Sequence, residues 1–283
     1  MILSDIKNYI ISYLDGIYEA NEAESIAYII LEDELKMSKI DLIINAGNIV
    51  NEKSVDRIHE ILIQLEQNKP IQYILGYADF YELKFKVNEH TLIPRQETEL
   101  LVHKIIELNK TRENISILDI GTGSGCIAIS LAKNVNANIT AVDFSEKAIE
   151  TAKTNAELNN VNVKFEILDI IKNQQQICDK KYDIIVSNPP YVTNTEKTKM
   201  QNNVLKYEPH SALFVDDNNP LEFYEAITIF AKNNLNLYGQ LWFEINEQFG
   251  SETKNLLIVN GFKDVQIIND LNEKNRIVFG SIV

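Results

Sequence analysis

Four consecutive residues, Asn188, Pro189, Pro190 and Tyr191, have the side chains and the spacing to do chemistry. They follow an apolar run at 184–186 that is typical of a buried strand, and neither proline can donate to a sheet ladder. Residues before prolines stay extended, so we predict a stiff turn at the carboxyl end of a strand, where open α/β sheets bind ligands. An amide and a flat aromatic ring held there suit a planar amino or amide group. The alternative is a strand-ending turn capped by an asparagine.

A glycine-rich turn forms a second candidate site at residues 119–125, Asp-Ile-Gly-Thr-Gly-Ser-Gly. It lies between a predicted strand at 115–120 and a predicted helix that begins at Cys126. Glycines permit a tight turn and close approach of a ligand, and the helix start offers free backbone N–H groups. The third glycine, Gly125, comes one residue too early for the G-x-G-x-x-G spacing of nicotinamide sites, and no lysine follows as in a phosphate loop.

Acidic residues follow the next two predicted strands. Asp143 ends the second strand, where a carboxylate can accept both hydroxyls of a ribose. Asp169 and Ile170 follow the third strand, where they can meet the amino group and the face of an adenine. Together with Asp119 before the glycines, this order fits S-adenosylmethionine, a sulfonium with a ribose and an adenine, better than a pyrophosphate cofactor. Taken singly, Asp119 and Asp169 can be ordinary caps.

The segments that position these residues alternate between strand and helix, which predicts an α/β fold. We expect a Rossmann-like, mainly parallel sheet with helices on both faces. The predicted strands cover 115–120, 138–143, 163–168, 182–186 and 240–245, the helices cover 126–133, 145–158, 220–235 and 248–260, and an antiparallel pair at 265–268 and 276–279 closes the sheet.

The part before this domain has a different character. Residues 1–70 have apolar residues at helical spacing and predict a small helical bundle, with Ser38 as one N-cap. Residues 71–93 are rich in tyrosine and phenylalanine and predict a β-hairpin linker, which leaves 94–283 as the α/β domain. Pro94 is expected in the first turn of a helix. Residues 193–206 are polar without periodicity and predict a mobile loop near the site.

Composition narrows the class of function. The 283 residues carry 27 basic and 41 acidic side chains, a net charge of −14, which argues against a bare nucleic-acid substrate. No run of 18 apolar residues predicts a membrane span, and the first residues lack the regions of a signal peptide. Cys126 and Cys178 form no disulfide or metal framework, and the four histidines have no metal-ligand spacing. We expect a soluble, cytoplasmic monomer without a metal.

With both sites in view, the chain resembles the protein-glutamine N5-methyltransferases that modify peptide chain release factors. The resemblance covers nearly the whole chain. The tetrapeptide is shared with adenine and other amino-group methyltransferases, whereas the 93–99 segment and the helical front part are more specific. The matching segments are 70–76 (Pro-Ile-Gln-Tyr-Ile-Leu-Gly), 93–99 (Ile-Pro-Arg-Gln-Glu-Thr-Glu), 119–125, 188–191, 207–209 (Tyr-Glu-Pro) and Glu244.

The resemblance implies a role for each site residue. Asn188, Pro189 and Tyr191 act in catalysis, Pro190 joins them in holding the substrate glutamine, and Asn188 also borders the cofactor. Arg95 and Glu97 shape the mouth of the site. The implied cofactor-binding residues are Gly121, Thr122, Gly123, Ser124 and Gly125 around the methionine part, Asp143 at the ribose, and Asp169 and Ile170 at the adenine, where many relatives have an aromatic residue instead.

The implied reaction moves a methyl group from S-adenosylmethionine to the side-chain amide of the glutamine in the Gly-Gly-Gln loop of class I release factors, which modulates translation termination. S-adenosylhomocysteine is the other product. The helical front part is expected to dock the factor, without direct contact to nucleic acid or membrane. Three alternatives are a glutamine methyltransferase acting on a ribosomal protein, an adenine-N6 methyltransferase acting on nucleic acid, and a module that binds the cofactor without catalysis.

Overall fold

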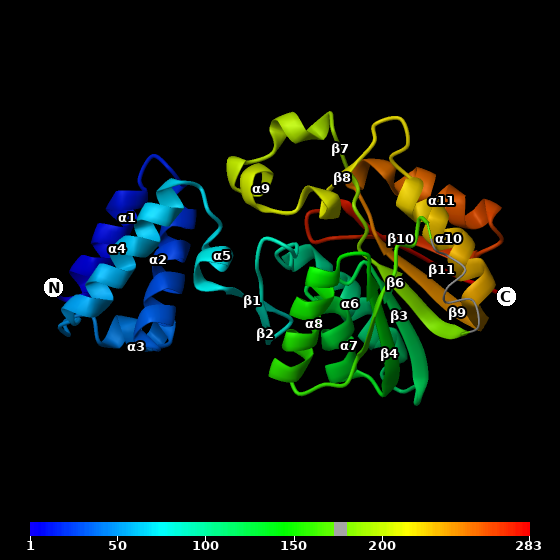
Figure 1. Cartoon of the computed structure of the whole chain (residues 1–283), viewed down its shortest axis with the longest axis horizontal. Coiled ribbons are helices and arrows are strands. Elements are labelled where there is room, and N and C mark those ends of the chain that lie inside the picture. The colour runs from blue at the N-terminus through cyan, green and yellow to red at the C-terminus, as the bar shows by residue number, and fades with distance from the viewer. Residues whose placement is uncertain (173–179) are drawn as a thin grey trace. The chain divides into compact units, whose positions relative to one another are not determined.

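The computed structural model describes residues 1–172 and 180–283, so Cys178 lies outside the described residues. The chain divides into two compact units, drawn in Figure 1. The first unit comprises Met1–Gly76 together with Asn202–Tyr207. The second unit comprises Tyr77–Gln201 and Glu208–Val283.

The first unit is helical, as the spacing of its apolar residues predicts. Its core holds fully buried aliphatic side chains such as Ile6, Ile30 and Leu62. Ser38 caps a helix as predicted: its hydroxyl accepts from the Asp41 backbone N–H while the Asp41 carboxylate accepts from the Ser38 N–H. The helices are α1 (Leu3–Leu14), α2 (Ala20–Leu35), α3 (Lys39–Ile44), α4 (Glu52–Glu66), α5 (Ile71–Leu75) and α9 (Asn202–Tyr207).

The hairpin after this unit is shorter than the predicted segment 71–93. Residues 71–75 form helix α5, which ends at Gly76 in the left-handed conformation. Only then do strands β1 (Tyr77–Phe80) and β2 (Leu83–Lys86) pair antiparallel. A five-residue helix holds too little periodicity to be told from a strand by pattern alone, which explains the difference.

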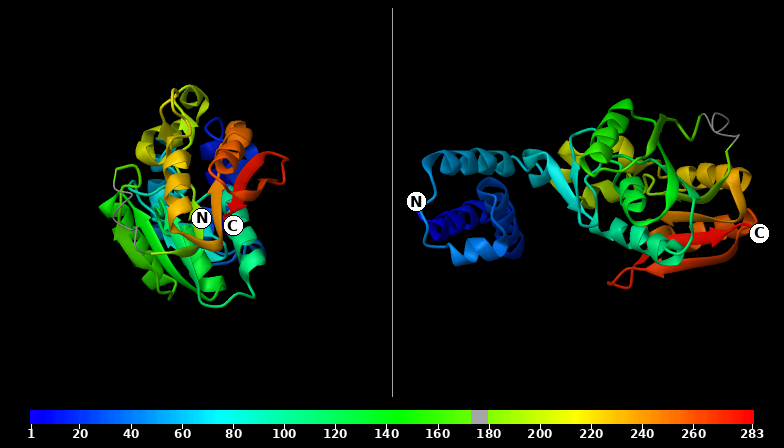
Figure 2. Two further views of the ribbon diagram at one scale, coloured as in Figure 1. Left: turned by 90° about the vertical axis from the view of Figure 1, so that its right-hand side faces the viewer. Right: turned by 90° about the horizontal axis from the view of Figure 1, so that it is seen from below.

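The second unit contains a seven-stranded sheet in the order β10-β11-β9-β6-β3-β4-β5. The five strands from β9 to β5 are parallel, and β11 and β10 close the sheet antiparallel as predicted. Helices cover both faces (Figures 1 and 2). The strands are β3 (Ile115–Ile120), β4 (Ala137–Asp143), β5 (Lys164–Ile167), β6 (Tyr182–Ser187), β9 (Leu235–Glu244), β10 (Lys263–Asn269) and β11 (Asn275–Ser281). The longer helices are α6 (Gln96–Asn109), α7 (Cys126–Asn134), α8 (Glu146–Leu158), α10 (Glu222–Asn234) and α11 (Gly250–Val259).

Alternation along each central strand divides the core into two layers. Ile117 and Ile184 point to the cluster packed by α6 and α7, whereas Leu118 and Ile185 point to the cluster packed by α10 and α11. All four side chains are fully buried. A strand that is covered on both faces must be apolar throughout. This continuous apolar pattern is why these strands can be predicted from the sequence.

Two predicted boundaries in this unit are wrong. Helix α6 begins at Gln96 with Arg95 as its N-cap, so Pro94 precedes the helix and is not part of its first turn. Strand β9 begins at Leu235 rather than at residue 240, because its first half pairs with β6 across an irregularity near Tyr182 and lacks a clean apolar pattern.

Residues 193–206 are more regular than their composition indicates. They contain the end of β7 (Val192–Thr193), the 3₁₀ helix η2 (Glu196–Lys199) and most of α9. β7 pairs with β8 (Phe214–Val215), and the Glu196 carboxylate accepts from the Thr193 backbone and hydroxyl. The mobility of this segment stays a prediction.

Asn155 on α8 joins the hairpin to the glycine-rich turn. Its Oδ1 accepts from the Lys86 backbone N–H at 2.7 Å, and its Nδ2 donates to the backbone oxygens of Lys86 at 3.0 Å and Ser124 at 2.9 Å. The side chain is fully buried. One amide therefore fixes two segments that are far apart in sequence.

Replacing Asn155 with alanine removes all three bonds and leaves the partners unpaired. Each unsatisfied buried group costs about 1–3 kcal/mol, so we expect the free energy of unfolding to fall by about 2 kcal/mol or more. Urea unfolding measures it. The control is Lys153→Ala at an exposed position of the same helix, expected within about 0.5 kcal/mol of wild type. Equal losses in the two variants would contradict the assignment.

Candidate active site

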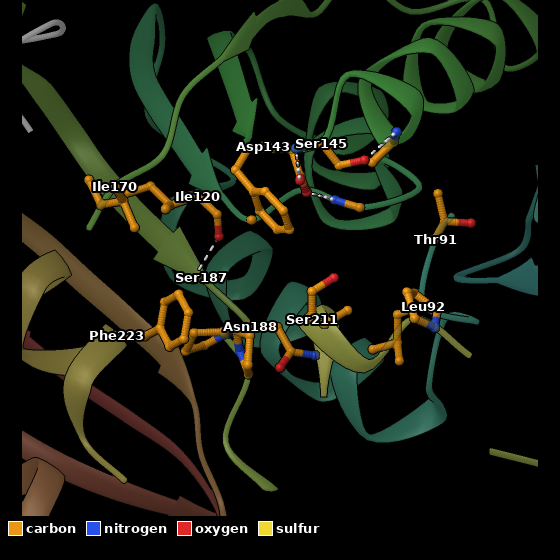
Figure 3. Close-up of a pocket in the computed structure, with 18 of the residues that line it drawn as sticks. Thr91, Leu92, Ile120, Asp143, Ser145, Ile170, Ser187, Asn188, Ser211 and Phe223 are labelled. Atoms are coloured by element: carbon orange, nitrogen blue, oxygen red, sulfur yellow. Dashed lines mark hydrogen bonds between the residues drawn. The ribbon is translucent and has the colours of Figure 1, made fainter. Parts of the chain in front are cut away.

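A cavity of about 220 Å³ lies in the second unit, beside the carboxyl ends of its parallel strands (Figure 3). This is the edge at which ligands bind in open α/β sheets. The walls include residues of three strand ends and of two connecting segments. The lining residues are Glu89, His90, Thr91, Leu92, Ile120, Gly121, Gly123, Asp143, Phe144, Ser145, Ala148, Leu168, Asp169, Ile170, Ser187, Asn188, Pro189, Pro190, Pro209, Ser211, Ala212, Phe223 and Ile227.

The glycine-rich turn follows β3 as predicted, and its three glycines differ in what a side chain would meet there. Gly121, Gly123 and Gly125 all have positive φ, at 75°, 55° and 84°. A Cβ on Gly125 would lie 2.8 Å from Ile129 Cδ1, whereas one on Gly121 or Gly123 would meet nothing within 4 Å. Gly125 thus permits helix packing, while Gly121 and Gly123 leave backbone open to the cavity.

Asp119 lies beneath this turn and is fully buried. Its Oδ2 accepts from the Thr122 hydroxyl at 2.6 Å, so Thr122 points into the protein rather than lining the cavity. Burial raises the pKa of Asp119 to about 7, because desolvation outweighs the hydrogen bond from Thr122. A buried acid behind a glycine turn favours a positively charged group nearby.

Asp143 is held in a fixed orientation at the end of β4. Its Oδ2 accepts from the Gly123 N–H and its Oδ1 from the Ser145 N–H, both at 2.9 Å. Ser145 in turn caps α8 through the Ala148 N–H, as predicted. Each carboxylate oxygen keeps a second lone pair for an outside donor, so the pair suits a vicinal diol.

Asp169 and Ile170 line the same cavity beyond β5. Asp169 Oδ1 accepts from the backbone N–H groups of Ile171 and Lys172, and Oδ2 pairs with Lys172 Nζ at 3.0 Å. The Ile170 side chain is buried. An exposed aromatic ring, Phe144, comes directly after Asp143, and that adjacency is a signal that sequence reasoning missed.

The tetrapeptide ends β6 as predicted, and three of its residues reach the cavity. Asn188, Pro189 and Pro190 line it, whereas Tyr191 does not. The Tyr191 ring packs on the apolar cluster beneath, and its hydroxyl donates to Glu244 Oε1 at 3.0 Å. Ser124 and Gly125 likewise belong to the turn without lining the cavity.

Two buried side chains behind the tetrapeptide were matched to a family pattern by sequence but given no role. Asn188 Nδ2 donates to Thr98 Oγ1 at 3.2 Å, and Thr98 Oγ1 donates to Glu244 Oε2 at 2.6 Å. Glu244 ends β9 and is 1% exposed. Burial raises its pKa in spite of the hydrogen bonds from Thr98 and Tyr191. The three residues are too far apart in the chain for any spacing rule to join them.

A further buried acid, Glu208, lies next to residues that line the cavity. Glu208 accepts from Arg95 Nη2 at 2.5 Å and from the Ile93 backbone N–H at 3.2 Å. Leu92 and Pro209, the neighbours of these groups, both line the cavity. Neither Arg95 nor Glu97 lines the cavity itself, so the role expected for them at its mouth stays a prediction.

Within the part of the chain that the structure describes, no three His, Cys, Asp or Glu side chains are grouped to hold a metal ion. In that same part no helix has the length and apolar character needed to cross a membrane.

The raised pKa of Asp119 makes the stability of the ligand-free protein depend on pH. The folded chain binds this proton more tightly than the unfolded chain, so stability falls as pH rises from 3.8 to about 7. Between pH 5.5 and 8, wild type should lose roughly 2 kcal/mol relative to Asp119→Asn. Urea unfolding at pH 5.5 and 8 measures the difference, with the exposed Asp79→Asn as control. A gap between wild type and Asp119→Asn that is the same at both pH values would contradict the prediction.

Comparison with known proteins agrees with this geometry. A model of the methyltransferase domain matches residues 111–257, and a model of the PrmC N-terminal domain matches residues 6–76. The release factor glutamine methyltransferase of Flavobacterium psychrophilum is 45% identical over 282 residues, covering 98% of each chain. That of Bacteroides thetaiotaomicron is 41% identical over 277 residues, covering 98% of this chain and 99% of the relative.

Among solved structures, a methyltransferase from Pyrococcus furiosus covers 80% of this chain and 98% of its own, with a TM-score of 0.52. At 21% identity this likeness supports the α/β methyltransferase fold and no more. The full-length sequence relatives carry the assignment further. The chain belongs to the release factor glutamine methyltransferase family.

Proposed function

We propose that this protein transfers a methyl group from S-adenosylmethionine to the side-chain amide nitrogen of the glutamine in the Gly-Gly-Gln loop of class I release factors. One observation carries the proposal: Asn188 and Pro189 line the same cavity as Gly121, Asp143 and Asp169. The residues suited to an amide and those suited to a nucleoside with a charged tail therefore share one space. Family membership supports the choice of partner.

The residues present fit the cofactor. Gly121 and Gly123 offer a wall without Cβ atoms, and Asp143 offers two oriented carboxylate oxygens. We assign the methionine part to the turn 121–125, the ribose to Asp143 and the adenine to Asp169 and Ile170, with Asn188 adjoining. When bound, the cofactor supplies a methyl group on a positively charged sulfur.

The tetrapeptide is assigned the acceptor amide. An amide nitrogen is a poor nucleophile because its lone pair is delocalised into the carbonyl. Asn188 Oδ1 and the Pro189 backbone oxygen each accept one N–H of the substrate, which turns the nitrogen lone pair toward the methyl group and stabilises the positive charge that develops on nitrogen. Bringing two bound reactants together in a productive geometry can lower a barrier by about 7–11 kcal/mol.

Tyr191 and Pro190 complete the assigned substrate site. Pro190 lines the cavity and stiffens the turn. Tyr191 is anchored to Glu244 through its hydroxyl, which holds the turn from below. Packing of the Tyr191 ring on the substrate amide stays a prediction. No strong base is required for the attack, since the product nitrogen loses its proton after transfer.

We further propose that the front part, residues 1–70, recognises the body of the release factor, that 71–93 link the parts, and that 94–283 carry out the transfer. The match of residues 6–76 to a family-specific domain supports this division. A translation factor as substrate places the reaction in the cytoplasm. The excess of acidic residues supports a protein partner rather than nucleic acid.

Methyl-labelled cofactor tests the substrate. Incubated separately with a release factor, ribosomal proteins and DNA, the enzyme should label the release factor at its Gly-Gly-Gln glutamine, read out by peptide mass spectrometry. A release factor in which that glutamine is replaced by alanine should stay unlabelled. Label in DNA or ribosomal proteins and none in the release factor would sink the proposed function.

Asn188→Ala tests the acceptor site. It should reduce transfer by about 100-fold or more, because it removes an oriented acceptor at the reacting amide. Binding of S-adenosylhomocysteine, measured by calorimetry, should stay near the wild-type value. Asn272→Ala, at an exposed asparagine far along the chain, is the matched control. If Asn188→Ala loses cofactor binding to the same extent as transfer, Asn188 serves the cofactor instead.

A further inference from the structure

We propose that Thr98 and Glu244 decide which end of the Asn188 amide faces the cavity, and are therefore positioning residues for methyl transfer. The inference rests on the proposed function and deepens it. Neither side chain lines the cavity, so each acts through Asn188. Thr98 lies on α6 and Glu244 ends β9, while Asn188 follows directly after β6.

The hydrogen bonds begin at Glu244. Both of its oxygens accept from hydroxyl groups, Oε1 from Tyr191 and Oε2 from Thr98. Burial raises the pKa of Tyr191, so its hydroxyl keeps its proton and is available to donate to Glu244 Oε1 at 3.0 Å. An acid that accepts on both oxygens is bonded as an ionised carboxylate.

The Thr98 hydroxyl links the Glu244 carboxylate to the Asn188 amide and fixes which group of that amide can bond to it. A threonine hydroxyl has one proton, and Thr98 gives it to Glu244 over 2.6 Å. Its oxygen can then only accept from its remaining neighbour. Asn188 lies 3.2 Å away and must present its NH2 group to Thr98. The Asn188 carbonyl oxygen is thereby turned away from Thr98. Because Asn188 lines the cavity (Figure 3), we assign this oxygen to the side that receives the substrate.

This direction matters because the two ends of an asparagine amide have opposite hydrogen-bonding character. With Oδ1 toward the cavity, Asn188 accepts from a substrate NH2 group. With the amide turned over, two NH2 groups would face each other and the substrate would lose one of its two acceptors. The chain of bonds thus selects a donor-bearing substrate nitrogen and orients it for attack.

Protonation of Glu244 would reverse the direction. A protonated carboxyl can donate to Thr98, which frees the Thr98 proton for the Asn188 carbonyl oxygen. The charged and titratable groups around the carboxyl are Tyr191, Tyr224, Cys126, Arg276 and Glu97, of which Arg276 favours the ionised form and Glu97 opposes it. Transfer should therefore fall at acid pH as Glu244 takes up a proton.

Four variants separate this role from simple packing. Thr98→Val keeps the shape of the side chain and removes the hydroxyl, while Thr98→Ser keeps the hydroxyl. Glu244→Gln keeps the shape and gives the position an NH2 donor, as protonation would. The matched control is Thr253→Val on α11: Thr253 is also fully buried, and its hydroxyl has no hydrogen-bond partner among the described residues.

For each variant we would measure kcat and KM on a release factor, the pH dependence of kcat, the affinity for S-adenosylhomocysteine and the urea unfolding of the ligand-free protein. We expect kcat to fall about 10- to 100-fold in Thr98→Val and Glu244→Gln, as for loss of a hydrogen bond to a charged group. Affinity for S-adenosylhomocysteine should change less than about threefold. Thr98→Ser and Thr253→Val should stay within about threefold of wild type. Glu244→Gln should lose the acid limb of the wild-type kcat profile.

Each contrary outcome is distinguishable. Wild-type kcat in Thr98→Val or Glu244→Gln would overturn the positioning role. A loss in Thr98→Val that Thr98→Ser does not restore, or that follows a matching loss of stability, would also overturn it. A wild-type enzyme that leaves the release factor unmethylated would refute the proposed function itself, before any variant is compared.

Discussion

The candidate site depends on a carboxylate buried where a strand end, a helix start and a proline-rich turn meet. Glu244 is 1% exposed, and an isolated charge in such a place is costly to desolvate. Hydrogen bonds from Thr98 and Tyr191 offset part of that cost. The same two bonds fix α6 and the tetrapeptide to β9, so a group that is costly to bury also sets the geometry of the acceptor amide.

The opposite wall of the cavity follows a similar principle. Asp143 spends one lone pair of each oxygen on the backbone of its own turn and of the next helix. The remaining lone pairs of Asp143 then have a fixed direction, and a ligand that binds them does not have to order the Asp143 side chain further. Glu208 does the same for the mouth by joining Ile93 and Arg95. Polar groups of this site are therefore held before a ligand arrives, which is what a reaction that relies on positioning requires.

Much of this could be predicted from the sequence because the informative features are local. The strand that ends at Ile120, the glycine turn after it and the acid at Asp143 lie at fixed offsets, and the buried strands are apolar throughout. The two prolines of the tetrapeptide are by themselves enough to predict a rigid turn. Resemblance to a family added the substrate, which no local feature indicates.

The remainder could not be predicted because it is made by contacts across the chain. Thr98 and Glu244 are 146 residues apart, and only the packing of α6 against β9 brings them together. Phe223 reaches the cavity from the start of α10, where its side chain resembles any other core residue in the pattern. The inward direction of Tyr191 likewise depends on Glu244 rather than on its neighbours in sequence.

The most direct test of the central claim is a neutron crystal structure of the enzyme with S-adenosylhomocysteine and a Gly-Gly-Gln peptide. Neutron density distinguishes the oxygen from the nitrogen of an asparagine amide, which ordinary X-ray maps do not. The account predicts that Asn188 Oδ1 accepts from the peptide glutamine and that its Nδ2 donates to Thr98. An amide turned the other way, with Nδ2 toward the peptide and a proton on Glu244, would contradict it.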